Sequence, residues 1–484
     1  MFNYKSKTLA LCLFFLSCST IGYRQIQEKL NLNLSKKDYV SALKIVNDKN
    51  FYPEERLDLL RKLEQGTVNY LAGNYKIALK YFDEAEKIDR DSFTVSISSK
   101  IKGGVDDNLD DYKSEKYESS MIRFYKSLIN YKLYRSIEGE EKIQYLRSAR
   151  SNIIEWDSLT KNYREETAGK PVYKQDLLLK LWGSFIFEEN DDHQRAMTSY
   201  SSAKDFLLKN YNIYPSFNKK SEEFKKNFDK LHLMPLNEIK NKLVSNTNYS
   251  DELGTFLDQK SNDKVIDNLF ILYKEGIIAQ KTTKTVKIPI ALSLFANNSR
   301  DFYDFIRSLY IFSDNDGIFV EIELPEIAQK HLNDKIIAKI FDMDGKEINN
   351  FSLFLVEPLS AIAYEDFNYE KTKIYAKLTA AAIAKYTTAI MASYALYKTA
   401  DQNPLASFAS TASFLASSKL IKESSMADIR QWSTLPDNIR IGSIKLPKGE
   451  YTIKLYSVYG EKNELIYTEN IKIDTSSILV DINH

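Results

Sequence analysis

The spacing of apolar residues changes near the middle of this 484-residue chain, and this change constrains the fold more than any other feature. From Ile26 to about Tyr211, apolar and aromatic residues recur every three or four positions, which is typical of helices with one buried face. From about residue 265 onward they alternate with polar residues, which predicts strands with one buried face. We therefore expect a multidomain α+β chain, with an all-α first half followed by a β-sandwich-like second half.

The clearest unit of the first half is residues 66–89, which resemble a tetratricopeptide repeat. The small alanines of this unit would let two helices cross closely, and its aromatic residues would fill the space toward the next helical hairpin. The residues at the motif positions are Gly66, Gly73, Tyr75, Ala78, Phe82 and Ala85. Two further copies carry Tyr39 and Ala42, and Ala196, Tyr200 and Ala203. Residues 117–156 predict another hairpin that turns near Gly139, so we expect roughly four helix pairs in a tetratricopeptide-like solenoid over residues 26–211.

Strands are predicted at 269–274, 285–292, 318–324, 335–342, 350–356, 439–446, 451–458 and 464–473. Residues 342–345, with the sequence DMDG, favour a hairpin turn over a calcium loop, because the other ligands of such a loop are missing. The lysine-rich stretch 212–264 is interpreted as a helical linker, and residues 265–484 as the β-rich domain.

An alanine-rich helical hairpin is inserted into the strand series at residues 365–428. Its first helix carries a small residue at every fourth position, which places all of them on one face. These residues are Ala376, Ala380, Ala384, Thr388 and Ala392. Such stripes occur where membrane helices pair, but three lysines interrupt this helix. We therefore favour a hairpin packed on its own β-domain, and self-association or membrane-surface contact through residues 376–420 and a true membrane span stay as alternatives.

The first eighteen residues have the pattern of an export signal, with two lysines, an apolar run from Leu9 to Leu16, and then Ser17 and Cys18. Residues 15–18 resemble a bacterial lipobox, in which the chain is cleaved between Ser17 and Cys18 and Cys18 is acylated. This pattern predicts a signal peptide at 1–17, a tether at 18–25 and a lipid anchor on the periplasmic face of the outer membrane. An ordinary signal peptide is the alternative.

Composition and motifs indicate no cofactor, no metal and no catalytic residue. The chain has 67 basic and 66 acidic side chains, so nothing favours nucleic acid as a partner. Its two cysteines cannot form a disulfide framework, and no two of its four histidines are spaced as a metal-binding pair on one helix. The sequence has no HExxH, GxSxG, GxxxxGK[ST] or GxGxxG motif. A pair of distant carboxylates, as in a glycosidase, remains open.

Along nearly its full mature length the chain resembles a family of uncharacterised Gram-negative outer-membrane lipoproteins that contain tetratricopeptide repeats. The resemblance rests on residues 268–276, 380–386, 428–436 and 446–452. Trp432, Leu435, Pro436 and Gly449 match the signature of that family, with a buried corner as their expected structural role. The resemblance implies a lipobox, tetratricopeptide-like helices and a β-rich end with an alanine-rich helical insert.

Three functions follow as hypotheses. The leading one is a non-enzymatic scaffold or adaptor that binds other envelope proteins through its helical repeats, in cell-wall or outer-membrane assembly. The second is an enzyme or saccharide binder that acts on the cell wall through the β-domain. The third is a structural subunit that multimerises through the 376–420 hairpin.

Overall fold

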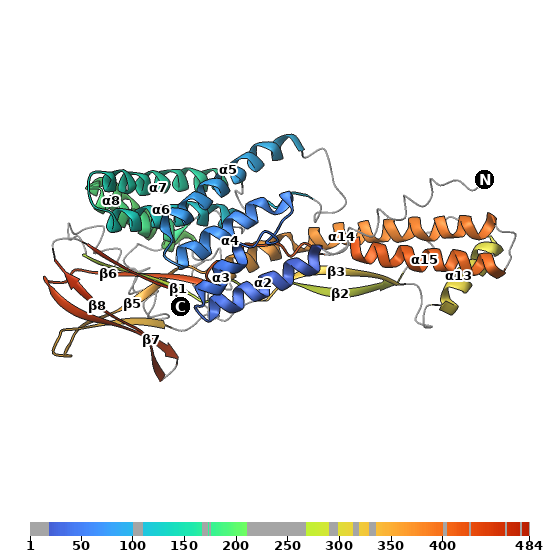
Figure 1. Ribbon diagram of the computed structural model, residues 1–484. Helices are drawn as coiled ribbons and strands as arrows, with labels where there is room; N and C mark the ends of the chain where they lie inside the picture. Colours follow the sequence, from blue (N-terminus) through green and yellow to red (C-terminus); the bar gives the residue numbers. More distant parts are fainter. Residues whose placement is uncertain are drawn as a thin grey trace.

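The structure is a computed structural model in which a helical layer covers a β-sheet and a long arm extends away from both (Figure 1). It describes residues 19–99, 110–166, 173, 176–210, 268–289, 299–312, 319–328, 335–399, 404–424, 427–459, 462–474 and 477–483. Helices fill the first half and the sheet lies mostly in the second, as the change of apolar spacing predicts. Ser17, Cys18 and the predicted linker at 212–264 lie outside the described residues.

In the described part of the first half, consecutive helices pair as four hairpins, in agreement with the roughly four helix pairs predicted. The pairs are α2 (Ser19–Ser35) with α3 (Tyr39–Val46), α4 (Asp58–Leu71) with α5 (Tyr75–Ser99), α6 (Lys116–Ser136) with α7 (Glu141–Glu166), and α8 (Leu177–Glu189) with α9 (His193–Asn210). A short 3-10 helix, η2 (Glu55–Leu57), precedes α4. Gly73 and Gly139 turn the second and third hairpins with φ of 79° and 92°, a conformation that favours glycine.

The repeat residues make the close contacts that their sizes predict. A Cβ at Gly66 would lie 2.9 Å from the ring of Phe82, so a larger residue at position 66 would force that ring to shift. The Phe82 ring stacks on Tyr125 of α6 with centroids 5.3 Å apart, and thus reaches the next hairpin. Tyr39 and Tyr75 are partly buried. The remaining aromatic and alanine positions, Tyr200, Ala42, Ala78, Ala85, Ala196 and Ala203, are buried.

The described strands of the second half form one seven-stranded sheet in the order β8-β7-β4-β5-β6-β1-β9, together with a two-stranded ribbon. The strands of the large sheet are β1 (Leu269–Glu275), β4 (Lys335–Phe341), β5 (Glu347–Glu357), β6 (Asn438–Ile444), β7 (Gly449–Tyr459), β8 (Lys462–Ile473) and β9 (Ile478–Asn483). All neighbours are antiparallel except β1 and β9. The turn at 342–345 joins β4 to β5, with Gly345 at φ 80°, which is the hairpin turn predicted there.

Strand β5 is shared between two halves of this sheet. Leu353 pairs with β4, whereas Phe354 pairs with β6 after a change of direction. One face of the bent sheet encloses a core of its own side chains, and the other face carries Phe270, against which Phe185 of α8 stacks with centroids 4.4 Å apart. The seven strands therefore form one continuous sheet that helices cover on one face. The sequence predicts a β-sandwich-like domain for this part of the chain. Alternation shows that one face of a strand is buried, but not which element buries it.

A buried ion cluster also joins the helical layer to the sheet. Asp481 of β9 accepts hydrogen bonds from Lys274 of β1 and from the hydroxyl of Tyr70 of α4. Lys132 of α6 lies 3.0 Å from the same carboxylate. Burial alone would raise the pKa of Asp481, but the two lysines outweigh it and hold the pKa well below its usual range.

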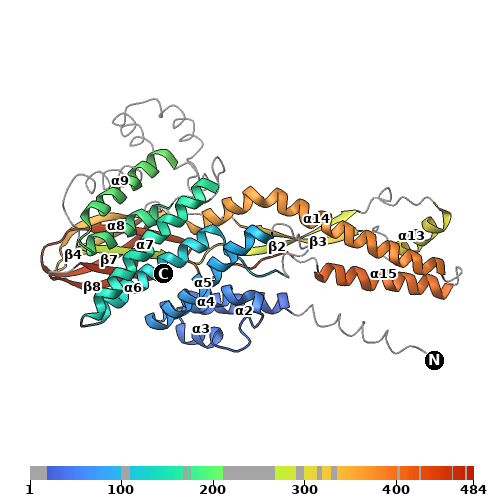
Figure 2. The ribbon, with the colours of Figure 1, turned by 90° about the horizontal axis from the view of Figure 1, so that it is seen from above.

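The arm consists of the ribbon β2 (Lys281–Pro289) and β3 (Phe319–Ile327), with α13 (Arg300–Phe312), α14 (Leu359–Thr399) and α15 (Pro404–Ser424) (Figures 1 and 2). The 41 residues of α14 give it a length of about 60 Å. Its first turn lies in the main core, and its later part forms a separate core with β3, α13 and α15. The predicted hairpin therefore packs on the ribbon and α13 and not on the seven-stranded sheet.

The stripe of small residues on α14 is exposed. Ala376, Ala380, Ala384, Thr388 and Ala392 all face solvent. The opposite face, with Tyr386, Ile390 and Tyr394, makes the contacts inside the arm because these large side chains bury more apolar area. None of the described helices combines the length and apolarity needed to cross a bilayer.

Candidate functional site

An extended segment of the chain lies between the helical layer and the sheet. We call residues Ala427–Asp437, which link α15 to β6, the inserted segment. Its consecutive backbone N–H groups at 431, 432 and 433 donate to side chains of three different hairpins. The acceptors are the Tyr23 hydroxyl on α2 at 3.2 Å, the Glu118 carboxylate on α6 at 2.9 Å and the Glu64 carboxylate on α4 at 2.9 Å. The helices thus bind a part of their own chain as they would bind a peptide.

Trp432 is the anchor of the inserted segment. Its ring is fully buried against Phe82 and Tyr125, with centroids 5.8 Å and 5.7 Å away. Its Nε1 donates to the hydroxyl of Thr67 at 2.9 Å. Phe82 and Trp432 therefore meet in one core, although the sequence pattern singles them out for different reasons.

Both glutamates that bind the inserted segment are fully buried. Burial raises the pKa of the Glu64 carboxyl to about 7, and the hydrogen bonds from Ser433 only partly oppose this shift. Burial, together with the negative charge of Glu115, raises the pKa of Glu118 to about 7 as well. These carboxyls are therefore protonated to a large extent near neutral pH.

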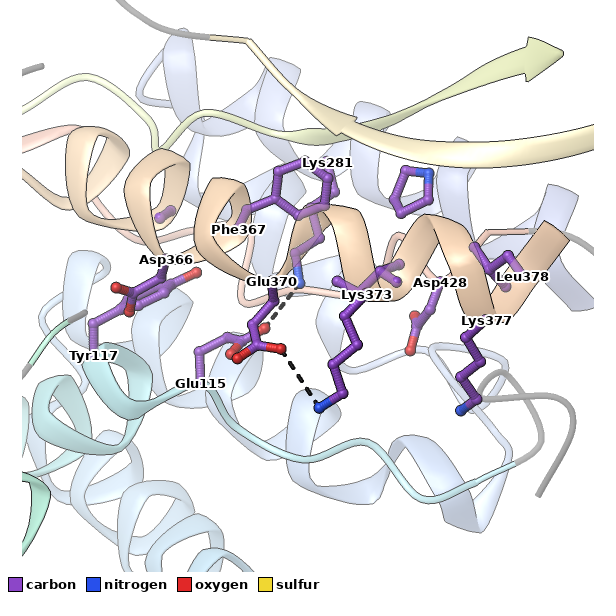
Figure 3. A pocket seen from close by; sticks show the side chains of 13 residues that line it. Glu115, Tyr117, Lys281, Asp366, Phe367, Glu370, Lys373, Lys377, Leu378 and Asp428 are labelled. Atoms are coloured by element: carbon purple, nitrogen blue, oxygen red, sulfur yellow. Dashed lines mark hydrogen bonds and ion pairs between the residues drawn. The ribbon is translucent and has the colours of Figure 1, made fainter. Parts of the chain in front are cut away.

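A cavity of about 420 Å³ opens beside the inserted segment, where the arm meets the body (Figure 3). We call it the junction cleft. Its walls come from α14, from the beginning of α6, from the ribbon and from Asp428 of the inserted segment. The lining residues are Glu115, Tyr117, Lys281, Pro325, Ala363, Asp366, Phe367, Glu370, Lys373, Ile374, Lys377, Leu378 and Asp428.

The junction cleft carries charges of both signs around apolar side chains. Lys281 pairs with Glu115 at 3.1 Å, and Lys373 lies 3.6 Å from Glu370, both drawn as dashed lines in Figure 3. Asp366 accepts a hydrogen bond from the backbone N–H of Tyr173 at 2.8 Å. Burial, with a contribution from the charge of Glu115, raises the pKa of Asp366 to about 7. The cleft can therefore bind a ligand with both an amine and an acidic or hydroxyl group.

The residues singled out from sequence fall into separate places. The repeat residues other than the exposed Gly73 lie in or against the main core, together with Trp432 and Leu435, and Pro436 is buried next to them in the chain. Gly449 begins β7, where a Cβ would meet the Tyr451 hydroxyl at 3.1 Å. The groups that line the cleft were not predicted, because nothing in the sequence distinguishes Asp366 or Glu115 from other acidic residues. In the described ranges no group of three or more metal-binding side chains is placed to hold an ion.

Comparison of the chain with known protein families, with curated proteins and with solved structures found no match. The features of the structure that bear on function are therefore the inserted segment, the junction cleft and the arm.

Proposed function

We propose that this chain is a lipid-anchored envelope protein that works as a non-enzymatic scaffold, and that the junction cleft is where it binds its partner. The observation that carries the proposal is the composition of the cleft walls, which come from the helical layer, the inserted segment and the arm at once. A peptide bound there would contact all three parts of the molecule. The lipobox pattern at residues 15–18 supports the anchor, and the stacked hairpins with their Gly66 and Phe82 contact support a tetratricopeptide-like layer.

The partner site differs from the one that the repeat pattern suggests. The helical face toward the sheet is filled by the inserted segment, and Trp432 is part of the continuous core there. Expelling a buried tryptophan would cost about 3–5 kcal/mol by comparison with Trp→Ala substitutions, before any new contact forms. A partner therefore binds more readily in the cleft, whose volume lies in the range of about 300–1,000 Å³ typical of ligand pockets.

The charges define the kind of peptide that fits. Asp366, Glu370 and Asp428 would face an amine or a basic side chain, and Lys373 and Lys377 an acidic one. Phe367 and Leu378 offer apolar contact between them. We expect a short segment of an envelope protein with charges of both signs.

The test uses two matched substitutions on α14. Ile374→Trp would place a large ring in the cleft, and Thr372→Trp places the same ring on an exposed position of the same helix outside it. Partners are captured by crosslinking in intact envelopes, followed by purification of the tagged full chain. We expect the specific partner to be recovered with wild type and T372W and lost with I374W. Equal recovery with all three chains would contradict the assignment of the cleft.

A second candidate, a saccharide-binding or saccharide-cleaving protein, is favoured by one observation. A carboxyl with a pKa near 7 in a cleft with further carboxylates has the properties of a general acid, and Asp366 lies beside Glu115 and Glu370 there. Release of reducing ends from purified peptidoglycan would test it. Activity of the wild type that is lost in Asp366→Asn would establish this candidate and overturn the non-enzymatic proposal.

A further inference from the structure

One face of the arm is covered by no other described element. Strand β3 and helix α13 pack on one side of the α14 and α15 pair, and the opposite side faces solvent. We call this side the outer face of the arm. Large apolar side chains of α14 and α15 are exposed together with the alanines, with Phe408 62% exposed, Leu396 51% and Leu415 42%. Met391 and Leu420 are exposed in the same way.

The exposed residues of α15 follow the period of one helical face. Phe408, Ala412, Leu415, Ala416 and Leu420 are all exposed, and their spacing of three or four residues, with Leu415 and Ala416 adjacent, keeps them on one side of the helix. The side chains of α15 that point toward the arm core, such as Phe414, are buried. The solvent side of α15 thus carries large apolar side chains in addition to Lys419.

Most of the length of these two helices carries charge of one sign. Residues 371–399 and 404–422 contain seven lysines and no acidic residue, whereas Glu365, Asp366 and Glu370 lie near the start of α14 and Glu423 near the end of α15. Lys398 and Lys419 are exposed among the lysines, and the exposed Lys373 and Lys377 line the junction cleft. On the ribbon, Glu321 of β3 pairs with Lys422 and Lys287.

We propose that the outer face of the arm lies on the surface of an anionic phospholipid bilayer, with its apolar side chains inserted among the headgroups and its lysines against the lipid phosphates. Helices that lie in the membrane interface typically expose apolar residues and lysines, with few or no acidic side chains among them. A second copy of the chain is a poorer occupant, because two faces with lysines alone repel each other. This inference does not depend on what the junction cleft binds.

The position of the amino terminus is consistent with this orientation. Helix α2 begins at the base of the arm, in both views of the molecule (Figures 1 and 2). A lipid on Cys18, one residue before α2, would therefore hold the base of the arm close to the bilayer. The arm would supply the second attachment that stable membrane binding requires beside an acyl chain.

The experiment measures binding of the mature-length chain, residues 18–484 with Cys18→Ala, to vesicles, so that no acyl chain contributes. Phe408→Trp provides a fluorescent reporter on the outer face, because the native tryptophans Trp156, Trp182 and Trp432 are fully buried. Vesicles of phosphatidylcholine alone are compared with vesicles that contain 30% phosphatidylglycerol, about the anionic share that gives lysine-rich segments measurable affinity. We expect a blue shift of the reporter and co-sedimentation only with the anionic vesicles, and weaker binding at high salt.

A double substitution tests the face itself. Phe408→Asp with Leu415→Asp should weaken binding at least about tenfold, because it removes apolar contact and adds repulsion from the lipid phosphates. Met343→Asp is the matched control, since Met343 is 62% exposed on the turn between β4 and β5, away from the arm. Circular dichroism shows whether each variant stays folded.

Four results would overturn the proposal. The first is no binding to anionic vesicles, and the second is binding that the double substitution leaves unchanged while the protein is folded. The third is a molar mass that rises with concentration and returns to the monomer value in the double variant, which would assign the outer face to a second copy. Crosslinking from position 415 in cells to an acidic protein, without any vesicle binding, would assign it to a protein partner instead.

Discussion

Glu64→Gln tests the assignment of a buried, protonated carboxyl beneath the inserted segment. The glutamine keeps a carbonyl oxygen where Glu64 accepts from the Ser433 N–H and hydroxyl, at 2.9 Å and 2.8 Å. It removes the ability to ionise. Because burial raises the pKa from 4.5 to about 7, the free energy of unfolding of the wild type should fall as the pH rises from about 4.5 to 7, where the unfolded chain releases a proton that the folded chain retains.

The expected size follows from that shift. A difference of about 2.5 pKa units corresponds to about 3 kcal/mol at about 1.36 kcal/mol per unit, and we take it as an upper value. At pH 4 the free energies of unfolding of the two chains should therefore differ only by the effect of replacing a carboxyl with an amide. At pH 8 the free energy of unfolding of the variant should rise by up to about 3 kcal/mol relative to wild type. The shifts at groups that do not interact with Glu64 cancel in this comparison, because both chains share them, whereas the charge of Glu118 contributes to the shift of Glu64 itself.

The assay is urea unfolding at pH 4, 6 and 8, followed by the fluorescence of the buried tryptophans, of which Trp432 lies in the inserted segment. Glu464→Gln, an exposed position on β8, serves as the matched control and should change stability by less than about 0.5 kcal/mol at every pH. A stability difference between E64Q and wild type that is the same at pH 4 and pH 8 would refute the reasoning.

Three further predictions concern the anchor, the ion cluster and the membrane. Trp432→Ala should lower the free energy of unfolding by about 3–5 kcal/mol, measured by urea titration, because it empties the space between the helical layer and the sheet. Asp481→Asn should cost about 3–5 kcal/mol at pH 7, since it leaves Lys274 and Lys132 buried beside an amide; a cost below 1 kcal/mol by the same titration would contradict this. Cys18→Ala should move the chain from the membrane to the soluble fraction at high salt, which membrane fractionation would show; undiminished membrane association would contradict the lipid anchor.

Local elements were predictable because their signal lies within a few residues. Spacing along the chain placed the hairpins around Gly73 and Gly139, and strands such as β4 and β7 begin and end within about two residues of the predicted positions. Helix α13 and strand β9 were not predicted, although the apolar residues of α13, Phe302, Phe305, Ile306 and Leu309, follow a helical period that could have indicated it.

The contacts that make the candidate sites were not predictable, because they join distant parts of the chain. The hydrogen bond from Ser433 to Glu64 spans 369 positions, and no local pattern indicates it. The junction cleft likewise combines Glu115 of the helical layer with Asp366 of the arm. Trp432, Leu435 and Pro436 drew attention to the inserted segment, but they gave no indication that the helical layer would bind it.

The sequence by itself determined the helical first half, the β-rich second half, the repeat contacts around Gly66 and Phe82, and the pattern of a lipid anchor, because each depends on residue size and spacing within one or two elements. Tertiary structure decided how these parts are used. It placed the inserted segment on the helical face that the repeats would otherwise offer, and it turned the small-residue stripe of α14 toward solvent. The physical reason is the size of the side chains. Trp432 and Tyr386 bury more apolar surface than an alanine does, so burying the large side chains and exposing the alanines stabilises the fold more.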